Sequence, residues 1–312
     1  MTPDTRTGVA AQKFLRASGA IGLAAAACVT YGVAVERRWY RLRHLRLDGV
    51  LRRGPGGRAP LPLRVLHLSD LHVQPREPKL GGFLREVAGH DYDLVVLTGD
   101  LLGNTDVEDH ALELLDPILA KAPGLMVLGS NDVFGPTQKS PSHYLLDPDH
   151  RVHGDRLDTD RLIDGLRERG VTTLRGGTTK LATRSGDVLA SGLDDPHLAT
   201  SKLPELDAIG VPADTDAVLH LGLTHAPYTA ALDMLIEAGH DLLLAGHTHG
   251  GQVRFPPYGA VVGNCDLPLD QIRGASKYEG RWLHVSPGLG SSPYTPFRFA
   301  CRPEATLLHL TL

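Results

Sequence analysis

The chain has 312 residues, of which 42% are hydrophobic and 22% are charged, enough for one large domain or two small ones with a packed core. Its three cysteines lie far apart and form no C-x-x-C pair, which argues against a disulfide framework and against a thiolate zinc site. Residues 59–312 carry 21 Lys and Arg against 33 Asp and Glu, and this net charge of −12 argues against a broad nucleic-acid-binding face, so no nucleic-acid partner is expected.

The first predicted element is an apolar helix over residues 17–35, which follows an N-terminal tail of residues 1–16. The 19 residues of the apolar stretch contain no charge. As a helix they would span roughly 28 Å, close to the apolar thickness of a bilayer. Trp39 and Tyr40 follow where an interface belt is expected. We predict a single-pass transmembrane helix, with a buried alanine-rich core helix and a cleaved signal peptide as the alternatives.

Residues 36–62 are predicted to be a basic juxtamembrane segment and linker. Residues 36–58 carry eight arginines against two acidic residues, a net charge of +6, and residues 54–62 read GPGGRAPLP. Arginines after the apolar stretch outnumber the basic residues before it, so the positive-inside rule favours a cytoplasmic position for the body of the protein at the cell membrane. The catalytic domain is expected to occupy residues 63–312.

From residue 63 onward, short apolar runs recur, and each ends in side chains that can bind metal. The runs read LRVLHLSDLH, DLVVLTGDL, GLMVLGSND, AVLHLGLTHAP and DLLLAGHTH. Each is rich in Leu and Val and bounded by Gly or polar residues, as expected of a buried strand. Helical stretches are predicted at about 107–121, 159–169 and 229–238. Alternating strands and helices indicate an α/β fold with mostly parallel core strands.

The side chains at the five strand ends are predicted to form a metal site. In an open parallel sheet, ligands collect beyond the carboxyl ends of the strands, so these side chains should converge. Taken singly, Asp-x-His and Gly-Asp are common turns, and a lone histidine before Ala-Pro can cap or pack. Turns alone do not explain five strand ends in a row with metal-binding side chains. The candidate residues are Asp70, His72, Asp100, Asn131, Asp132, His225, His247 and His249.

The order of these motifs resembles that of the calcineurin-like metallophosphoesterases. The series is Asp-x-His, Gly-Asp, a Gly-x-Asn-Asp segment, a lone His and Gly-His-x-His, and it covers the chain from residue 63. The stretch GHTHGGQVRFPPYG at residues 246–259 is similar to the membrane-associated bacterial phosphodiesterase branch, which includes relatives of UDP-diacylglucosamine pyrophosphatase. The resemblance implies a four-layer sandwich of two mixed β-sheets flanked by helices. Strands near 188–192, 283–286 and 305–310 would supply the other sheet.

The resemblance also implies a site for two divalent metal ions. The first ion would be held by Asp70, His72 and His249, and the second by Asn131, His225 and His247. Asp100 would bridge the two ions. Independently of the resemblance, carboxylate and imidazole ligands without thiolate suit Mn, Fe or Zn. Such a metal pair clamps a phosphoryl group and lowers the pKa of a bridging water, so that hydroxide attacks phosphorus in line.

One motif departs from the family pattern. Where the family has Gly-Asn-His-Asp, this chain has Gly129, Ser130, Asn131 and Asp132. An alignment without gaps puts Ser130 in the ligand slot and Asn131 in the slot of the histidine that assists the leaving group. Because an amide oxygen is a better ligand than a hydroxyl, we expect Asn131 to reach the second metal by a local shift, with Ser130 as the alternative. Asp132 could protonate a leaving group only with a strongly raised pKa, and we keep it, with Asp100 and Asn131, as a candidate catalytic residue.

Four further residues are candidates for binding the substrate. Arg254 and Tyr258 follow the Gly-His-x-His motif, and Gly250 would let the backbone approach the substrate. His143 lies in the long stretch 133–158, which is either a lid or an ordinary solvated insertion.

The sequence therefore predicts a membrane-anchored, dinuclear metal-dependent phosphoesterase. Its substrate would be a phosphodiester or a pyrophosphate, and the anchor and the resemblance favour a lipid-linked one. A phosphomonoesterase acting on proteins or small molecules is the first alternative. A catalytically weak, metal-bound regulatory module at the membrane is the second, suggested by the missing histidine.

Overall fold

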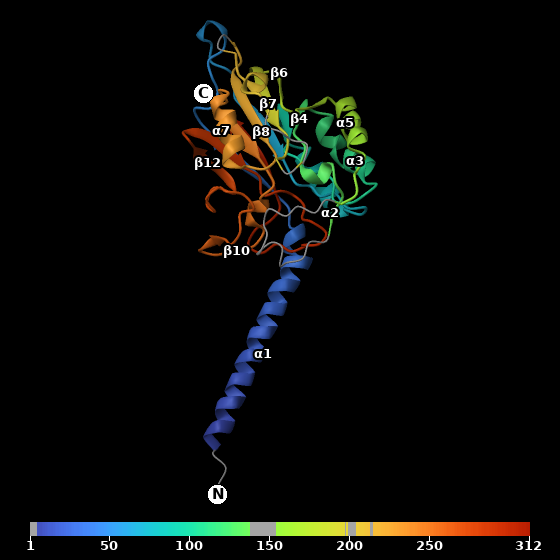
Figure 1. Ribbon diagram of the computed structural model, residues 1–312, viewed down its shortest axis with the longest axis vertical. Helices are drawn as coiled ribbons and strands as arrows, with labels where there is room; N and C mark the ends of the chain where they lie inside the picture. The colour runs from blue at the N-terminus through green and yellow to red at the C-terminus, as the bar shows by residue number, and fades with distance from the viewer. Residues whose placement is uncertain (1–4, 138–153, 197, 199–203, 213–214) are drawn as a thin grey trace.

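The computed structural model describes residues 5–137, 154–196, 198, 204–212 and 215–312. Two mixed sheets of six strands each lie face to face, helices cover their outer faces, and one long helix projects from the end of the body (Figure 1).

The first sheet contains the first three strands that the sequence predicts after residue 63, together with three others. Its order is β1 (Arg41–Leu47), β14 (Glu304–Leu310), β2 (Leu63–Leu68), β3 (Leu94–Leu97), β4 (Gly124–Met126) and β5 (Val171–Thr173). Strands β2 to β5 are parallel, whereas β14 runs antiparallel to β2 and parallel to β1.

The second sheet has the same mixed character. Its order is β12 (Gly274–Tyr278), β13 (Arg281–Val285), β9 (Leu242–Ala245), β8 (Leu219–Thr224), β7 (Gly186–Leu193) and β6 (Gly177–Thr183). The four central strands are parallel, and both edge strands are antiparallel to their neighbours. A separate hairpin joins β10 (Arg254–Phe255) to β11 (Gly259–Ala260).

The central strands are buried on both faces, which explains their nearly continuous apolar sequences. Val65 and Val96 of the first sheet pack in one cluster with Leu221 and Leu244 of the second, while Leu66 points to the opposite face. The helices α2 (Pro78–Val87), α3 (Glu108–Leu119) and α5 (Thr159–Glu168) cover that face, and α6 (Leu206–Ile209) and α7 (Thr229–Glu237) cover the second sheet. The predicted four-layer sandwich of two mixed sheets flanked by helices is confirmed.

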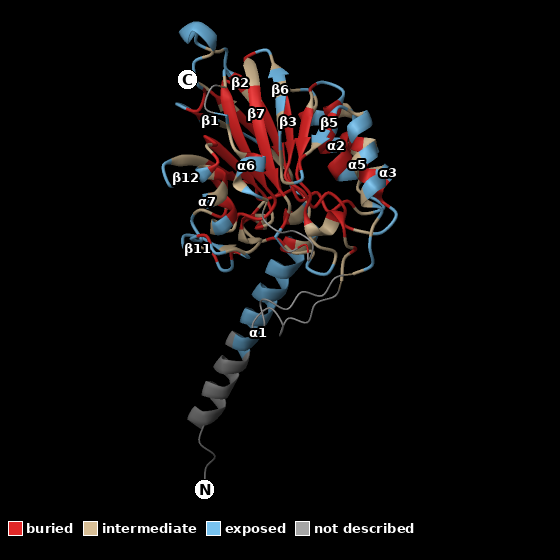
Figure 2. Cartoon of the chain, turned by 45° about the horizontal axis from the view of Figure 1, so that its top comes forward, coloured by how far each residue is buried: buried red, intermediate tan, exposed pale blue. Residues whose placement is uncertain are grey.

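Helix α1 (Thr5–Ala34) extends away from this body, and the side chains of residues 18–31 are exposed (Figure 2). Within the described residues, Ser18–Arg38 is the one stretch long and apolar enough to cross a membrane, and its place near the N-terminus is also that of a signal sequence. Because only 6% of its most apolar window is buried, the alternative of a buried core helix does not describe it.

The segment after α1 differs from the expected linker. Residues 41–47 form strand β1 at the edge of the first sheet, and Leu47, Val50 and Leu51 are buried in the core between the sheets. Two short 3-10 turns flank this part of the chain, η1 (Glu36–Arg38) and η2 (Pro55–Gly57). An edge strand keeps one side open to water, so it can carry arginines that a central strand could not. Much of the stretch 36–62 is therefore part of the folded body.

A candidate metal centre at the strand ends

The carboxyl ends of the central strands of both sheets meet at the end of the body from which α1 projects (Figures 1 and 2). The predicted ligands come within five residues after these strands: Asp70 and His72 after β2, Asp100 after β3, Asn131 after β4, His225 after β8, and His247 and His249 after β9. Both sheets thus contribute to one site, although its residues span most of the sequence.

Three of the predicted ligands form a compact group. The ligand atoms of Asp70, His72 and His249 all lie within 4.8 Å of one another. His72 Nε2 lies 3.2 Å from His249 Nε2, and His249 Nε2 lies 3.6 Å from Asp70 Oδ1. One cation between these atoms could reach all three side chains, as predicted for the first metal.

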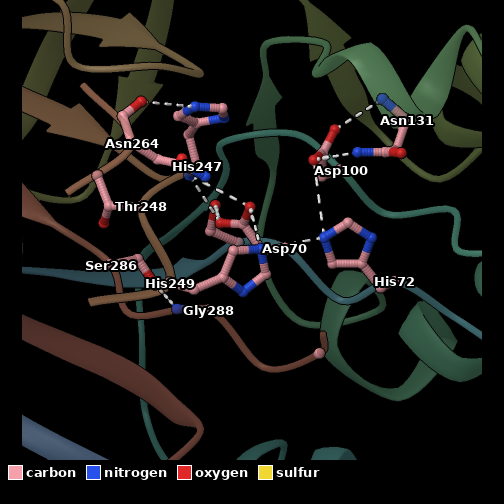
Figure 3. A network of polar contacts seen from close by, with 12 residues as sticks. Asp70, His72, Asp100, Asn131, His247, Thr248, His249, Asn264, Ser286 and Gly288 are labelled. Carbon is pink, nitrogen blue, oxygen red and sulfur yellow. Dashed lines mark hydrogen bonds and ion pairs between the residues drawn. The ribbon is translucent and has the colours of Figure 1, made fainter. Parts of the chain in front are cut away.

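Asp100 lies between this group and the remaining candidates. Its Oδ2 is 3.7 Å from His72 Nε2 and 3.5 Å from His225 Nε2 (Figure 3 shows the contact with His72). The ring of His247 lies 5.2 Å from that of His225 between centroids, and its Nε2 lies 3.1 Å from the carbonyl oxygen of Asn264. This central position of Asp100 is the one a bridging carboxylate needs.

The loop with the unusual motif places Asn131, rather than Ser130, against the bridging aspartate. The Asn131 side-chain Nδ2 donates to Asp100 Oδ2 at 2.6 Å, and its backbone N–H donates to Oδ1 at 2.8 Å (Figure 3). Ser130 opens the short 3-10 turn η3 (Ser130–Asp132) and donates its backbone N–H to Asp195 Oδ2 at 2.9 Å. The side chain of Asn131, rather than that of Ser130, therefore contacts Asp100, and its role as a ligand of a second metal ion remains a prediction.

Asp132 is fully buried, and its two carboxylate oxygens accept backbone N–H groups from two loops. Oδ2 accepts from Asp100 and Gly129 at 2.8 and 2.9 Å, and Oδ1 accepts from Leu101 and Leu102 at 2.7 and 3.3 Å. Burial and the nearby Asp100 carboxylate raise the pKa of Asp132 to about 7, whereas the N–H donors favour the charged form. These contacts suit a residue that fixes the loops after β3 and β4.

Five of the predicted ligands have backbone conformations that residues with a side chain rarely adopt. Their φ angles lie between 44° and 68°, and the residues are Asp70, His72, Asp100, His247 and His249. Such a conformation costs about 1–3 kcal/mol at each position and is concentrated at functional sites. Glycines next to the ligands allow the close packing, since a Cβ on Gly288 would come within 2.7 Å of the Asp70 Cβ.

Asp195 is a site residue that the sequence analysis missed. It follows β7, is fully buried, and its Oδ2 lies 3.9 Å from His225 Nε2. The signal was present, because residues 188–196 read VLASGLDDP, an apolar run that ends in two aspartates like the other strand ends. The order of the strands in the second sheet was needed to show that this end reaches the site.

The charges of the site fit a divalent cation. Asp70, Asp100 and Asp195 bring three buried carboxylates together, and burial and the Asp100 charge raise the pKa of Asp70 to about 7. His225 Nε2 is buried and forms no hydrogen bond within the described residues. A cation among these groups would offset the repulsion between the carboxylates and provide the imidazole nitrogen with a partner.

Arg298 is the second residue that the sequence analysis missed. It is fully buried, and its Nη2 lies 3.2 Å from His249 Nδ1 and donates to the carbonyl oxygens of Pro287 and Gly290 at 2.8 and 2.6 Å. Arg298 thereby connects the Gly-His-x-His loop to the segment that packs against α1, where its backbone N–H contacts the Gly32 carbonyl oxygen at 3.4 Å.

The four candidates for substrate binding are spread more widely. Gly250 is buried in the short turn η4 (His249–Gly251), and Arg254 donates to its carbonyl oxygen at 2.9 Å. Tyr258, between β10 and β11, is 90% exposed. His143 lies outside the described residues. Their roles in binding substrate remain predictions.

Known proteins resemble this chain in sequence and in fold. A family model described as "Calcineurin-like phosphoesterase" matches residues 63–251, more than half of the chain. "Uncharacterized metallophosphoesterase YkoQ" of Bacillus subtilis (strain 168) is 29% identical over 246 residues, which cover 78% of this chain and 82% of that protein. "Phosphodiesterase YaeI" of Escherichia coli (strain K12) is 27% identical over 256 residues, covering 80% and 82%. Among solved structures, Haemophilus influenzae NAD nucleotidase matches with a TM-score of 0.46 and 11% identity, covering 80% of this chain and 49% of that chain.

Proposed function

The chain belongs to the calcineurin-like phosphoesterase family and is a metal-dependent phosphoester hydrolase, and from this premise we propose that it is a membrane-anchored, dinuclear phosphodiesterase or pyrophosphatase. The observation that carries the proposal is the position of Asp100. Its carboxylate lies within 3.7 Å of a histidine from each of the two ligand groups, His72 and His225.

Two divalent ions, Mn, Fe or Zn, would clamp the phosphoryl group and supply a nucleophile at neutral pH. Asp70, His72 and His249 would hold the first ion, and Asn131, His225 and His247 the second. The left-handed backbone at four of these ligands and at Asp100 holds the side chains in place before substrate arrives, which lowers the cost of reaching the reactive geometry.

Asp195 completes the second position in this proposal. A serine stands in the family's ligand slot, and the backbone N–H of that serine binds the Asp195 carboxylate at 2.9 Å. The same carboxylate faces His225 Nε2 at 3.9 Å. Asp195 would therefore act as a ligand or as the carboxylate that orients the ligands at this position.

Protonation of the leaving group is the weak step of this site. The family's histidine position holds Asn131, whose amide donates to Asp100, and the nearby Asp132 carboxylate is occupied by backbone N–H groups. A phosphate leaving group is already a stable anion and needs little help from an acid. The site therefore favours pyrophosphate-type and aryl substrates over simple alkyl esters.

The proposed membrane anchor favours a substrate that is part of a membrane lipid. Gly32, near the end of α1, packs against Phe297 and Arg298, and Arg298 contacts the metal ligand His249. If α1 spans a bilayer, the metal centre opens close to its surface, which favours a lipid-linked phosphodiester or pyrophosphate. The positive-inside rule favours the cytoplasmic side.

The full chain, loaded with Mn²⁺ in detergent micelles, tests the proposal. Bis-p-nitrophenyl phosphate should be hydrolysed faster than p-nitrophenyl phosphate, and a screen of lipid extracts should identify a pyrophosphate-linked or diester-linked product. The reverse preference for the monoester would indicate a phosphomonoesterase. Stoichiometric metal binding without turnover of either compound would indicate a regulatory module.

A further inference from the structure

A pocket of about 650 Å³ lies at the root of α1, between the end of that helix, the edge of the first sheet and the β10–β11 hairpin. Its charged lining consists of Arg41, Arg43, Arg254, Arg273, Arg302 and Glu36. None of the predicted metal ligands lines it. We propose that this arginine pocket binds the phosphate headgroup of an anionic phospholipid.

The pocket carries an excess of positive charge. Glu36 is buried, and its carboxylate accepts the backbone N–H groups of Ala300 and Cys301, at 2.9 and 2.5 Å. Glu304, fully buried beneath the pocket, pairs with Arg41, with Arg43 at 3.9 Å and with Arg273 at 3.4 Å. Five arginines face two carboxylates, so a net charge of about +3 remains.

The arginines are positioned before a ligand arrives. Arg302 stacks over the Trp39 ring at 4.0 Å and donates to the Trp39 and Tyr40 carbonyl oxygens at 2.9 and 3.0 Å. Arg254 is held by the Gly250 carbonyl oxygen. The side chain of Arg43 is 43% exposed. A guanidinium has five donors in a planar fork that fits phosphate oxygens, so each arginine keeps donors for an anion.

Aromatic side chains connect the pocket to the apolar surface on both sides. The Phe299 ring lies 6.4 Å from Tyr31 of α1 and 6.2 Å from Phe255 of the hairpin, measured between centroids. Phe255 is 53% exposed, and at the hairpin tip Tyr258 is almost fully exposed. Basic groups flanked by exposed aromatic residues are typical of protein surfaces that rest on an anionic bilayer.

The position of the pocket along the axis of α1 favours a lipid headgroup, rather than a soluble anion, as the ligand. The charge-free run ends at Val35, so in a bilayer the headgroup layer would surround residues 35–39, where Glu36 lines the pocket and Trp39 stacks with the pocket residue Arg302. This step depends on the proposed anchoring of α1, but not on the proposed reaction. A lipid in the pocket would dock the body beside the turn that carries His249, because Arg254 contacts that turn.

The test uses the full chain, free of metal, in a non-ionic detergent. Trp282→Phe leaves Trp39 as the one tryptophan of the chain, beside Arg302, and its fluorescence reports on the pocket. Dihexanoyl phosphatidylglycerol should give a saturable change, at least about tenfold tighter than dihexanoyl phosphatidylcholine. The double variant Arg43→Gln with Arg254→Gln should weaken the binding about tenfold or more, whereas Arg58→Gln, an exposed arginine outside the pocket, should not.

Equal affinity for the two lipids would overturn the proposal, as would a loss of affinity in Arg58→Gln equal to that in the double variant. Inorganic phosphate that binds as tightly as phosphatidylglycerol would also overturn it, because the pocket would then be a site for soluble phosphate. If the double variant does not fold, Arg43→Lys with Arg254→Lys keeps the charge but loses the planar fork, and undiminished binding then counts against the proposal. Because no metal or turnover is involved, failure of the reaction proposed above leaves this test unaffected. Flotation with neutral phosphatidylcholine vesicles measures membrane anchoring by α1 independently of lipid binding in the pocket.

Discussion

The two proposed metal positions share Asp100 but are built from different parts of the molecule. The first combines Asp70 and His72, from one strand end of the first sheet, with His249 of the second sheet, and their ligand atoms lie within 4.8 Å of one another. The second relies on the second sheet for His225, His247 and Asp195 and on the first sheet only for Asn131. In our proposal, the second position, whose ligand loop has changed, is completed by a carboxylate from a neighbouring strand.

Removal of the shared carboxylate should have the largest effect. Asp100→Ala should abolish binding of both metal ions and lower the hydrolysis of bis-p-nitrophenyl phosphate by at least about three orders of magnitude, about 4 kcal/mol of transition-state stabilisation. Metal analysis and steady-state kinetics measure both. Asp91→Ala, an exposed acidic residue outside the site, serves as the control. Two metal equivalents retained by the Asp100 variant would contradict the bridging role.

Substitution of Asp195 should separate the two positions. Asp195→Asn keeps the shape of the side chain but removes its charge, so the affinity for the second metal equivalent should fall about 10–100-fold while the first is nearly unchanged. Calorimetric metal titration resolves the two equivalents.

The neighbouring Asp194 offers a matched control. It is partly exposed and lies 3.6 Å from Arg175, so Asp194→Asn should leave both affinities within about twofold of the wild type. If the two variants behave alike, Asp195 has no special role at the second position.

The chemistry of the second position can be examined with substrates in place of variants. Without a positioned acid, a contribution of typically 10²–10⁴ to the rate is missing for poor leaving groups. Rates for a series of phosphodiesters should therefore fall steeply as the leaving-group pKa rises. A flat series, with the chemical step shown to limit the rate, would reveal an acid at this site.

The last prediction concerns stability rather than activity, at the contact that joins the two sheets behind the site. His67 of β2 and His284 of β13 are fully buried, and their Nδ1 atoms lie 2.8 Å apart. Burial lowers the pKa of His284 to about 4 and holds that of His67 well below its usual range. In the unfolded chain both histidines take up protons below about pH 6.5. Their contribution to stability is therefore complete above pH 6.5 and is lost as the pH falls from 6.5 toward 4.

For His284 this loss amounts to at most about 3 kcal/mol in the free energy of unfolding. Chemical denaturation between pH 7.5 and 4.5 measures it as the difference between wild type and His284→Gln. The variant should lose less stability than the wild type on acidification. Parallel pH profiles would show that the pKa of His284 is not depressed in the folded protein.

Much of the fold could be read from the sequence because the central strands are buried on both faces. Short runs such as LVVL at 94–97 and LLLA at 242–245, bounded by Gly or polar residues, are typical of strands in the interior of a sheet. Strand β1 could not be predicted from the sequence because of its arginines, since RLRHLRL suits a basic juxtamembrane segment as well as an edge strand. Only its pairing with β14, the last strand of the chain, distinguishes the two.

The sequence by itself determined which side chains gather at the candidate metal centre, because parallel strands end in the same direction and Asp70, Asp100 and His225 each follow one. The tertiary structure alone decided which other strand ends reach the same point. Asp195 arrives there because β7 lies next to β8, and Arg298 because the segment before β14 packs against α1. The tertiary structure also decided the left-handed backbone conformation at the predicted ligands, since such strain persists only where the surrounding packing imposes it. Local patterns set the chemistry of a strand end, whereas the order of strands across the sheets sets its neighbours.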